Sequence, residues 1–118
     1  MSVYVVQKQH RWDAQKQELV QKYDLEPAEE YGDLVYLLSP TAAPFNSKPI
    51  VEELKESLYG FSDDDYLLLI GNPALIGFAV AIAADNNQGN LKLLQWSGKD
   101  KKYLPIKVNG LFTYDDGK

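Results

Sequence analysis

The stretch Asp65-Tyr-Leu-Leu-Leu-Ile-Gly-Asn-Pro-Ala-Leu-Ile-Gly-Phe-Ala-Val-Ala-Ile-Ala-Ala-Asp85 decides the fold class of this chain. Its continuous apolar run at 66–70 is typical of a strand that is buried on both faces of a parallel sheet. Asn72 stands where the N-cap of a helix belongs, and Pro73 stands at the first helical position. The stretch therefore predicts a buried strand, a tight turn and a helix, which together indicate an α/β fold.

The flanking sequence predicts four more strands and one more main helix. β-branched and aromatic residues favour strands at 3–7, 34–38, 91–96 and 103–108, and the last two form a hairpin around 97–102. Apolar spacing predicts an amphipathic helix from Pro49 to Tyr59, ended by Gly60. The order β-β-α-β-α-β-β gives an α/β (or α+β) domain with a mixed five-stranded sheet, a parallel centre and an antiparallel final hairpin.

Length and spacing divide the 118 residues into one domain, 1–108, and a loosely held tail, 109–118. Residues 10–31 form a polar excursion, in which Trp12, Leu19 and Tyr23 fall close to one helical face. We expect either a short amphipathic helix or a mobile segment there. Pro27 is expected to begin a single helical turn that Gly32 ends.

Composition excludes several kinds of chemistry. The chain has no cysteine, which removes disulfides, thiolate metal sites and cysteine nucleophiles. Its single histidine, His10, has no Gly-x-Ser-x-Gly motif to accompany it, so we predict no catalytic residues, no metal site and no cofactor. The apolar runs are too short to cross a bilayer and the first residues lack the features of a signal peptide, so we expect an intracellular protein without membrane contact.

The net charge of −5 disfavours general binding to DNA or RNA, which needs a surplus of lysine and arginine. A basic protein surface is a better-matched partner for such a chain. The acidic clusters at 24–33 and 63–65 leave open a third interpretation, in which the protein mimics nucleic acid toward a basic protein.

A small polar rim is the alternative candidate site. Gly71 and Asn72 follow the central strand, and Ser39 and Thr41 follow the strand at 34–38. In open α/β sheets, ligands bind beyond the carboxyl ends of the strands, so these four residues predict a small-ligand or nucleotide site, with catalysis left open. No phosphate-binding glycine motif is present, and Pro73 removes one backbone amide.

Two further features suggest protein contacts. The final hairpin carries Trp96 and Tyr103, expected to pair across the strands, and the basic turn residues Lys99 and Lys101, so we predict a contact patch there. The helix at Ala74–Ala84 is apolar on every side, and one sheet face covers only one side of a helix. Residues 12–23, the loop at 39–49 or a second subunit must cover the rest, so a homodimer through or near this helix stays open. Gly77 is expected to mark a close neighbour.

The chain resembles a family of short proteins from tailed bacteriophages. The resemblance lies in residues 23–46 (YDLEPAEEYGDLVYLLSPTAAPFN), in the opening stretch 65–85, in 93–98 (LLQWSG) and in Tyr103, and it spans about 3–108. The family carries no settled activity, so it supplies no site residues. It implies a viral protein that works in the cytoplasm of a bacterial host. We therefore expect a non-enzymatic accessory protein that binds a host or phage protein.

Overall fold

The computed structural model describes residues 1–112, and the rest of the expected tail, 113–118, lies outside the described residues. The strands are β1 (Ser2–Gln7), β2 (His10–Asp13), β3 (Glu18–Gln21), β4 (Asp33–Leu38), β5 (Tyr66–Leu68), β6 (Leu91–Ser97) and β7 (Lys102–Val108). The helices are the 3-10 helix η1 (Glu26–Tyr31) and the α-helices α1 (Ser47–Ser57) and α2 (Pro73–Asn86). The predicted α/β class is confirmed.

Five strands form the main sheet in the order β4-β1-β5-β6-β7. β1 pairs in parallel with both β4 and β5, β5 pairs in parallel with β6, and β7 is antiparallel to β6. The predicted mixed sheet with a parallel centre and an antiparallel final hairpin is therefore confirmed. β4, which follows β1 in the sequence, lies on one side of β1, and β5 lies on the other side. The direction in which strands are added along the sheet therefore reverses at β1.

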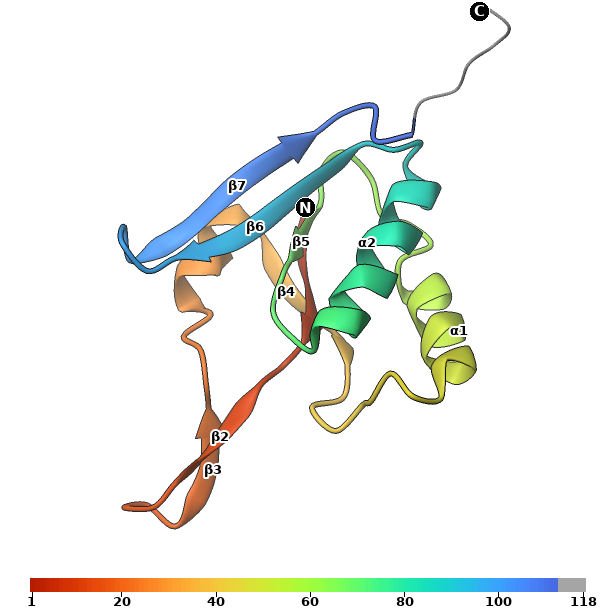
Figure 1. Ribbon diagram of the computed structural model, residues 1–118. Coiled ribbons are helices and arrows are strands. Elements are labelled where there is room, and N and C mark those ends of the chain that lie inside the picture. The colour runs from red at the N-terminus through yellow and green to blue at the C-terminus, as the bar shows by residue number, and fades with distance from the viewer. Residues whose placement is uncertain (113–118) are drawn as a thin grey trace, which may run out of the picture.

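The main sheet is covered on both faces, as its apolar strands require. Figure 1 shows α1 and α2 on one face, where Val6, Leu67 and Leu91 pack with Leu54 and Leu75 of the helices. On the other face, the buried side chains belong to the segment around η1, the central strands and β7, namely Val3, Val5, Leu25, Ala28, Leu68, Ile70, Leu94 and Tyr103. The sheet therefore separates two cores.

Residues 10–21 form a two-stranded arm, and the helix predicted from the spacing of Trp12, Leu19 and Tyr23 is wrong. β2 and β3 pair antiparallel as a separate sheet, with Trp12 directly opposite Leu19. The arm projects away from the body (Figure 1). Asp13 begins its turn, because its carboxylate accepts the backbone N–H groups of Gln15 and Lys16. The predicted helical turn ended by Gly32 is confirmed as η1.

The apolar helix α2 takes part in a core cluster of its own chain, to which the loop at 39–49, one of the segments that the sequence suggested, contributes Ala42. Cover by a second subunit stays a prediction for this helix. The helix packs between β1 and α1, with Leu75, Ala79, Ala83 and Ala84 buried. Its outward face carries the small residues Ala74, Gly77 and Ala81, which are exposed. The expectation of a close neighbour at Gly77 is wrong within the described chain, since a Cβ there would meet no atom within 4 Å.

Candidate functional site at the root of the arm

The candidate site lies where the direction of the chain along the main sheet reverses, between the carboxyl ends of β1 and β5. In open α/β sheets such a switch point is the usual place for a ligand. In this protein the arm leaves the body at that point, because β2 begins only three residues after β1 ends. We call the segment 21–24, which returns from the arm to the body, the arm root.

Gln7, the last residue of β1, occupies the centre of the switch point and is only 2% exposed. Its side-chain amide nitrogen donates to the carbonyls of Ser39 (3.0 Å) and Ala42 (2.9 Å). Its side-chain oxygen accepts from the backbone N–H of Asn72 (2.9 Å) and from the side chain of Gln9 (3.1 Å). Because buried polar groups need partners, Gln7 joins the loop after β4, the turn after β5 and the start of the arm.

Gly71 fits closely against Gln7. Its φ of +141° lies in a region that side chains disfavour, and a Cβ at this position would lie 2.7 Å from the Cβ of Gln7. The glycine thus lets the turn after β5 approach β1. Sequence reasoning named Gly71 and missed Gln7. The available signal was the period of two along β1, which places Gln7 on the same face as the buried Val3 and Val5.

The four predicted rim residues surround Gln7. Asn72 is confirmed as the N-cap of α2, because its side-chain oxygen accepts the N–H of Ala74 at 2.8 Å. The hydroxyl groups of Ser39 and Thr41 lie 2.9 Å apart in a hydrogen bond. The Ser39 hydroxyl also accepts the backbone N–H of Thr41. These polar groups therefore bond within the chain, and the predicted ligand site at the rim stays a prediction.

A cavity of about 270 Å³ lies beside the rim, against the arm root. Gly71 and Tyr23 line it together with Gln9, Leu69, Ile70, Gln95 and Trp96. Tyr23 and Trp96 are each more than one-third exposed, so two aromatic rings face solvent at this point. The cavity combines aromatic surface with two glutamine side chains and has no charged residue in its lining.

The hairpin of β6 and β7 forms one wall of this cavity, through Gln95 and Trp96 of β6. Trp96 and Tyr103 pair across the strands as expected, with ring centroids 5.0 Å apart in an edge-to-face arrangement. Tyr103 is buried, and its hydroxyl donates to the carbonyl of Asp24 at 2.8 Å. Burial, together with Asp24 and Tyr23, raises the pKa of Tyr103 to about 12. Tyr103 thus fixes the arm root to the sheet.

The predicted contact residues consequently differ in their surroundings. Trp96 is 39% exposed beside the buried Tyr103, and Lys99 and Lys101 lie exposed in the turn at 98–101. The turn is organised by Ser97, whose hydroxyl donates to the carboxylate of Asp100 and accepts its backbone N–H. Tyr103 offers little surface to a partner, while the other three residues remain accessible.

An acidic groove of about 610 Å³ lies on the opposite side of the arm root, between η1 and β4. Asp24, Glu26 and Glu29 line it, and Lys22 is the only basic residue in its lining. The remaining lining residues are Gln21, Tyr23, Leu25, Leu34 and Tyr36. Tyr36 is 45% exposed, and Lys8 holds its ammonium 5.0 Å from the centre of that ring. The groove therefore joins carboxylates to exposed aromatic surface.

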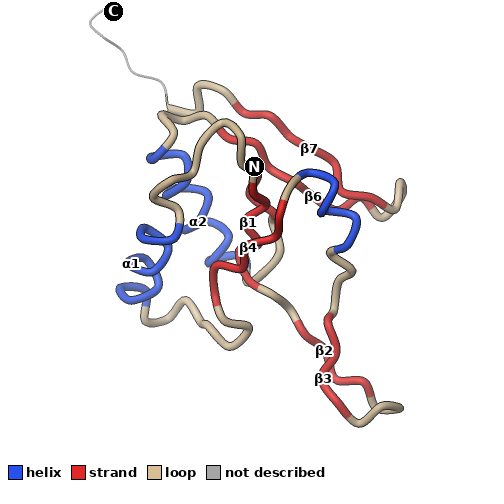
Figure 2. The backbone as a smooth tube through the Cα atoms, turned by 180° about the vertical axis from the view of Figure 1, so that it is seen from behind, coloured by secondary structure: helices blue, strands red, loops and turns tan. Residues whose placement is uncertain are grey.

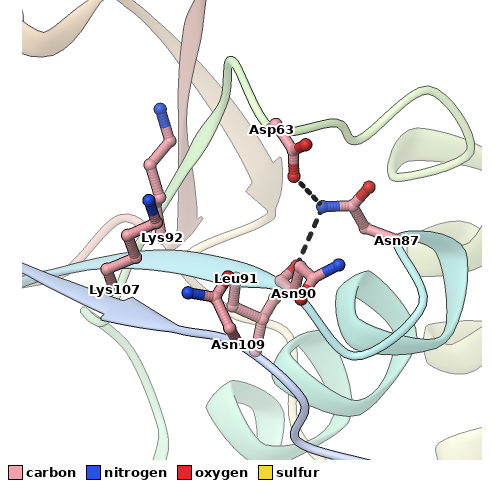
Figure 3. A pocket seen from close by; sticks show the side chains of 7 residues that line it. All are labelled: Asp63, Asn87, Asn90, Leu91, Lys92, Lys107 and Asn109. Atoms are coloured by element: carbon pink, nitrogen blue, oxygen red, sulfur yellow. Dashed lines mark hydrogen bonds between the residues drawn. The ribbon is translucent and has the colours of Figure 1, made fainter.

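A further cavity, of about 240 Å³, lies near the end of α2 and the start of β6 (Figure 3). Figure 3 shows Asn87 donating both to the carboxylate of Asp63 and to the carbonyl of Asn90, each at 2.9 Å. Lys92 and Lys107 extend from the strands on the other side. Asp63, part of the acidic run at 63–65, thus helps to attach the end of α2 to the preceding loop.

The arm carries the most exposed apolar pair of the described sheets. Trp12 is 58% exposed and Leu19 is 66% exposed, although they face each other across the two strands. No residue of β2 or β3 is buried. A two-stranded ribbon without a core is marginally stable in water.

One protein-family model matches almost the whole chain. Residues 1–110 match the model of the family described as Phage Pam3 gp32-like protein. The chain belongs to the Phage Pam3 gp32-like protein family. The predicted relationship to a phage family is thereby confirmed, and the match includes the arm, the switch point and the acidic groove. No curated protein and no solved structure matches the chain.

Among residues 1–112, no group of three or more histidine, cysteine, aspartate or glutamate side chains is arranged to hold a metal ion. In the same part of the chain, no helix combines the length and the apolar character needed to cross a membrane.

Proposed function

We propose that this phage protein is a non-enzymatic accessory protein that binds a host or phage protein in the host cytoplasm, with the arm as its contact surface. The observation that carries the proposal is the exposed pair of Trp12 and Leu19 on a ribbon that makes no core of its own. Tryptophan is among the side chains that dominate the energy of protein interfaces. The accessible Trp96 and Lys99 at the neighbouring hairpin extend the surface.

A capture experiment with a disabled arm tests this function. The tagged chain and its Trp12→Ser/Leu19→Ser variant are expressed during infection, cross-linked and purified, and the captured proteins are quantified. We expect a specific host or phage protein whose recovery falls at least about tenfold with the variant, because truncation of a hot-spot residue costs about 2 kcal/mol or more in binding free energy. Phe45→Ser is the matched control, since Phe45 is 97% exposed in a loop away from the arm. Equal recovery with both variants would remove the arm from the interface.

A second function, binding of a small ligand, is supported by the cavity at the switch point. Its lining of Trp96, Tyr23 and two glutamines suits a planar, uncharged ring that stacks on an aromatic face and exchanges hydrogen bonds with amides. A free nucleobase has this chemistry. The proposal keeps Gly71 of the predicted rim in the site and extends it toward the arm root.

Quenching of tryptophan fluorescence by free nucleobases tests the second function. We expect saturable quenching in the native chain and none in Trp96→Phe, while Trp12→Phe keeps the effect because Trp12 lies out on the arm. Saturable quenching that persists in Trp96→Phe, or its absence from the native chain, would contradict this site.

A further inference from the structure

The two edges of the main sheet differ in how they are protected against pairing with another strand. Edge strands commonly carry lysine or proline, which prevent a further strand from adding to the sheet. The edge strand β7 contains Lys102, Pro105 and Lys107 within seven residues. The opposite edge strand, β4, contains neither lysine nor proline, and its one charged residue is Asp33 at its start.

The unprotected edge adjoins the acidic groove. Leu34 and Tyr36 of β4 line the groove, and Figure 2 shows β4 on the outer side of the sheet, between α1 and the 3-10 helix η1. A strand added to β4 would place alternate side chains over the groove, because side chains of a strand point to its two faces in turn. Main-chain bonds along β4 would supply affinity, and the groove would select the side chains.

The charge of the groove identifies the side chains that it would select. Three carboxylates, those of Asp24, Glu26 and Glu29, face one ammonium group, that of Lys22, and Glu30 and Asp33 follow in the same segment. Lysine and arginine complement this surface, and the exposed ring of Tyr36 already attracts one cation, that of Lys8. A second copy paired edge to edge would bring two such acidic segments together, which disfavours it.

We infer that β4 and the acidic groove bind an extended segment of a partner protein, with lysine or arginine at alternate positions, as an added strand of the main sheet. The inference rests on the proposed function that this protein binds another protein, and it names the chemistry of the bound segment. It adds the groove to the contact surface that the arm provides.

A capped peptide of alternating lysine and valine is the probe. We expect backbone amide resonances of 33–38 to shift in NMR spectra when it binds, and their hydrogen exchange to slow. The Glu26→Lys/Glu29→Lys variant should bind this peptide at least about tenfold more weakly and should instead bind the matching peptide of alternating glutamate and valine. Because the swapped peptide restores binding, a variant that simply misfolds is distinguished from one that changes specificity.

Tyr36→Lys places a protective lysine on β4 and should weaken binding of the lysine peptide by a similar factor. Ile106→Lys is the matched control, because Ile106 is 39% exposed on the edge strand β7. The inference is overturned if the amides of 33–38 do not respond, if the charge-reversed variant keeps its affinity for the lysine peptide, or if Ile106→Lys has the same effect as Tyr36→Lys.

Two other outcomes would also overturn the inference. A native dimer in sedimentation that Tyr36→Lys converts to monomer would make a second copy the occupant of the edge. Loss of partner capture with the arm variant, without any peptide binding at β4, would refute the groove and leave the proposed function standing. Peptide binding at β4, with capture unchanged by the arm variant, would instead remove the arm from the contact surface.

Discussion

The five-stranded body and the two-stranded arm are built from the same kind of ladder, yet they obtain their stability differently. In the body, the central strands are buried on both faces, and the polar side chain at the switch point has partners for its donor and its acceptor. In the arm, no residue is buried, and the largest apolar side chains face solvent. The difference indicates that the body is stabilised by its own core, to which the arm contributes no buried residue.

Removal of the polar junction of the body should have the largest effect on its stability. Gln7→Leu keeps the volume of the side chain but leaves the N–H of Asn72 and the carbonyls of Ser39 and Ala42 without their partner. Loss of these three part-buried hydrogen bonds should cost about 4 kcal/mol in the free energy of unfolding, measured by denaturant titration. Gln9→Ala, which removes a single bond to Gln7, is the control and should cost less than about 1 kcal/mol. Similar losses in both variants would argue against Gln7 as the junction.

The second change tests how closely the turn after β5 fits against β1. Gly71→Ala places a Cβ 2.7 Å from the Cβ of Gln7 and forces a side chain into a backbone region with φ of +141°. We expect a loss of about 3 kcal/mol, from backbone strain and overlap together. Gly77→Ala is the control, since its Cβ would meet open space and the change improves helix propensity by up to about 1 kcal/mol. A neutral Gly71→Ala variant would show that the turn relaxes.

The third change concerns the bond that holds the arm root to the sheet. Tyr103→Phe removes the donor to the carbonyl of Asp24 and should cost about 1 kcal/mol near neutral pH. Its effect also depends on pH. The pKa of Tyr103 is about 12 in the folded protein and near 10 when unfolded, so the unfolded state loses this proton first.

Stability of the native chain should therefore fall as the pH rises from about 10 through about 12. The phenylalanine variant should show a shallower fall, measured as the slope of unfolding free energy against pH. It should keep part of the slope, because burial also raises the pKa of Tyr4 and of Tyr31. An unchanged slope in Tyr103→Phe would contradict the role of its hydroxyl group.

The body was predictable from sequence because its signals are local and strong. Apolar runs, the Asn72-Pro73 cap and the two-residue period determined the strands, the helices and the rim turn. The arm was not predictable from sequence, because its apolar and polar residues alternate only weakly and its turn lacks the glycine that marks many hairpins. Gln17 takes the left-handed conformation there, with φ of +56°. Trp12, Leu19 and Tyr23 happen to have spacings that also fit a helix.

Sequence reasoning named some residues of the candidate site and missed others, because it recognises local signals better than long-range contacts. Gly71 and Asn72 belong to a local turn, which sequence shows, whereas Gln7 acts through partners 32 to 65 residues away. The acidic groove likewise depends on where β4 lies in the sheet, and strand order follows from tertiary packing. The acids at 24–33 were visible in the sequence, but the edge strand beside them was not.

Removal of the arm should have the smallest effect on the stability of the body. Replacing residues 10–21 with a short glycine-serine turn removes the arm and leaves the body with all of its buried residues. We expect the free energy of unfolding to change by less than about 1 kcal/mol, since exposed ribbon contributes little burial and loop closure depends weakly on length. Denaturant titration measures this change, and the slope of the titration should fall only slightly because little surface is lost. A loss of several kcal/mol would mean that the arm stabilises the switch point, and the body could then no longer be regarded as independent of it.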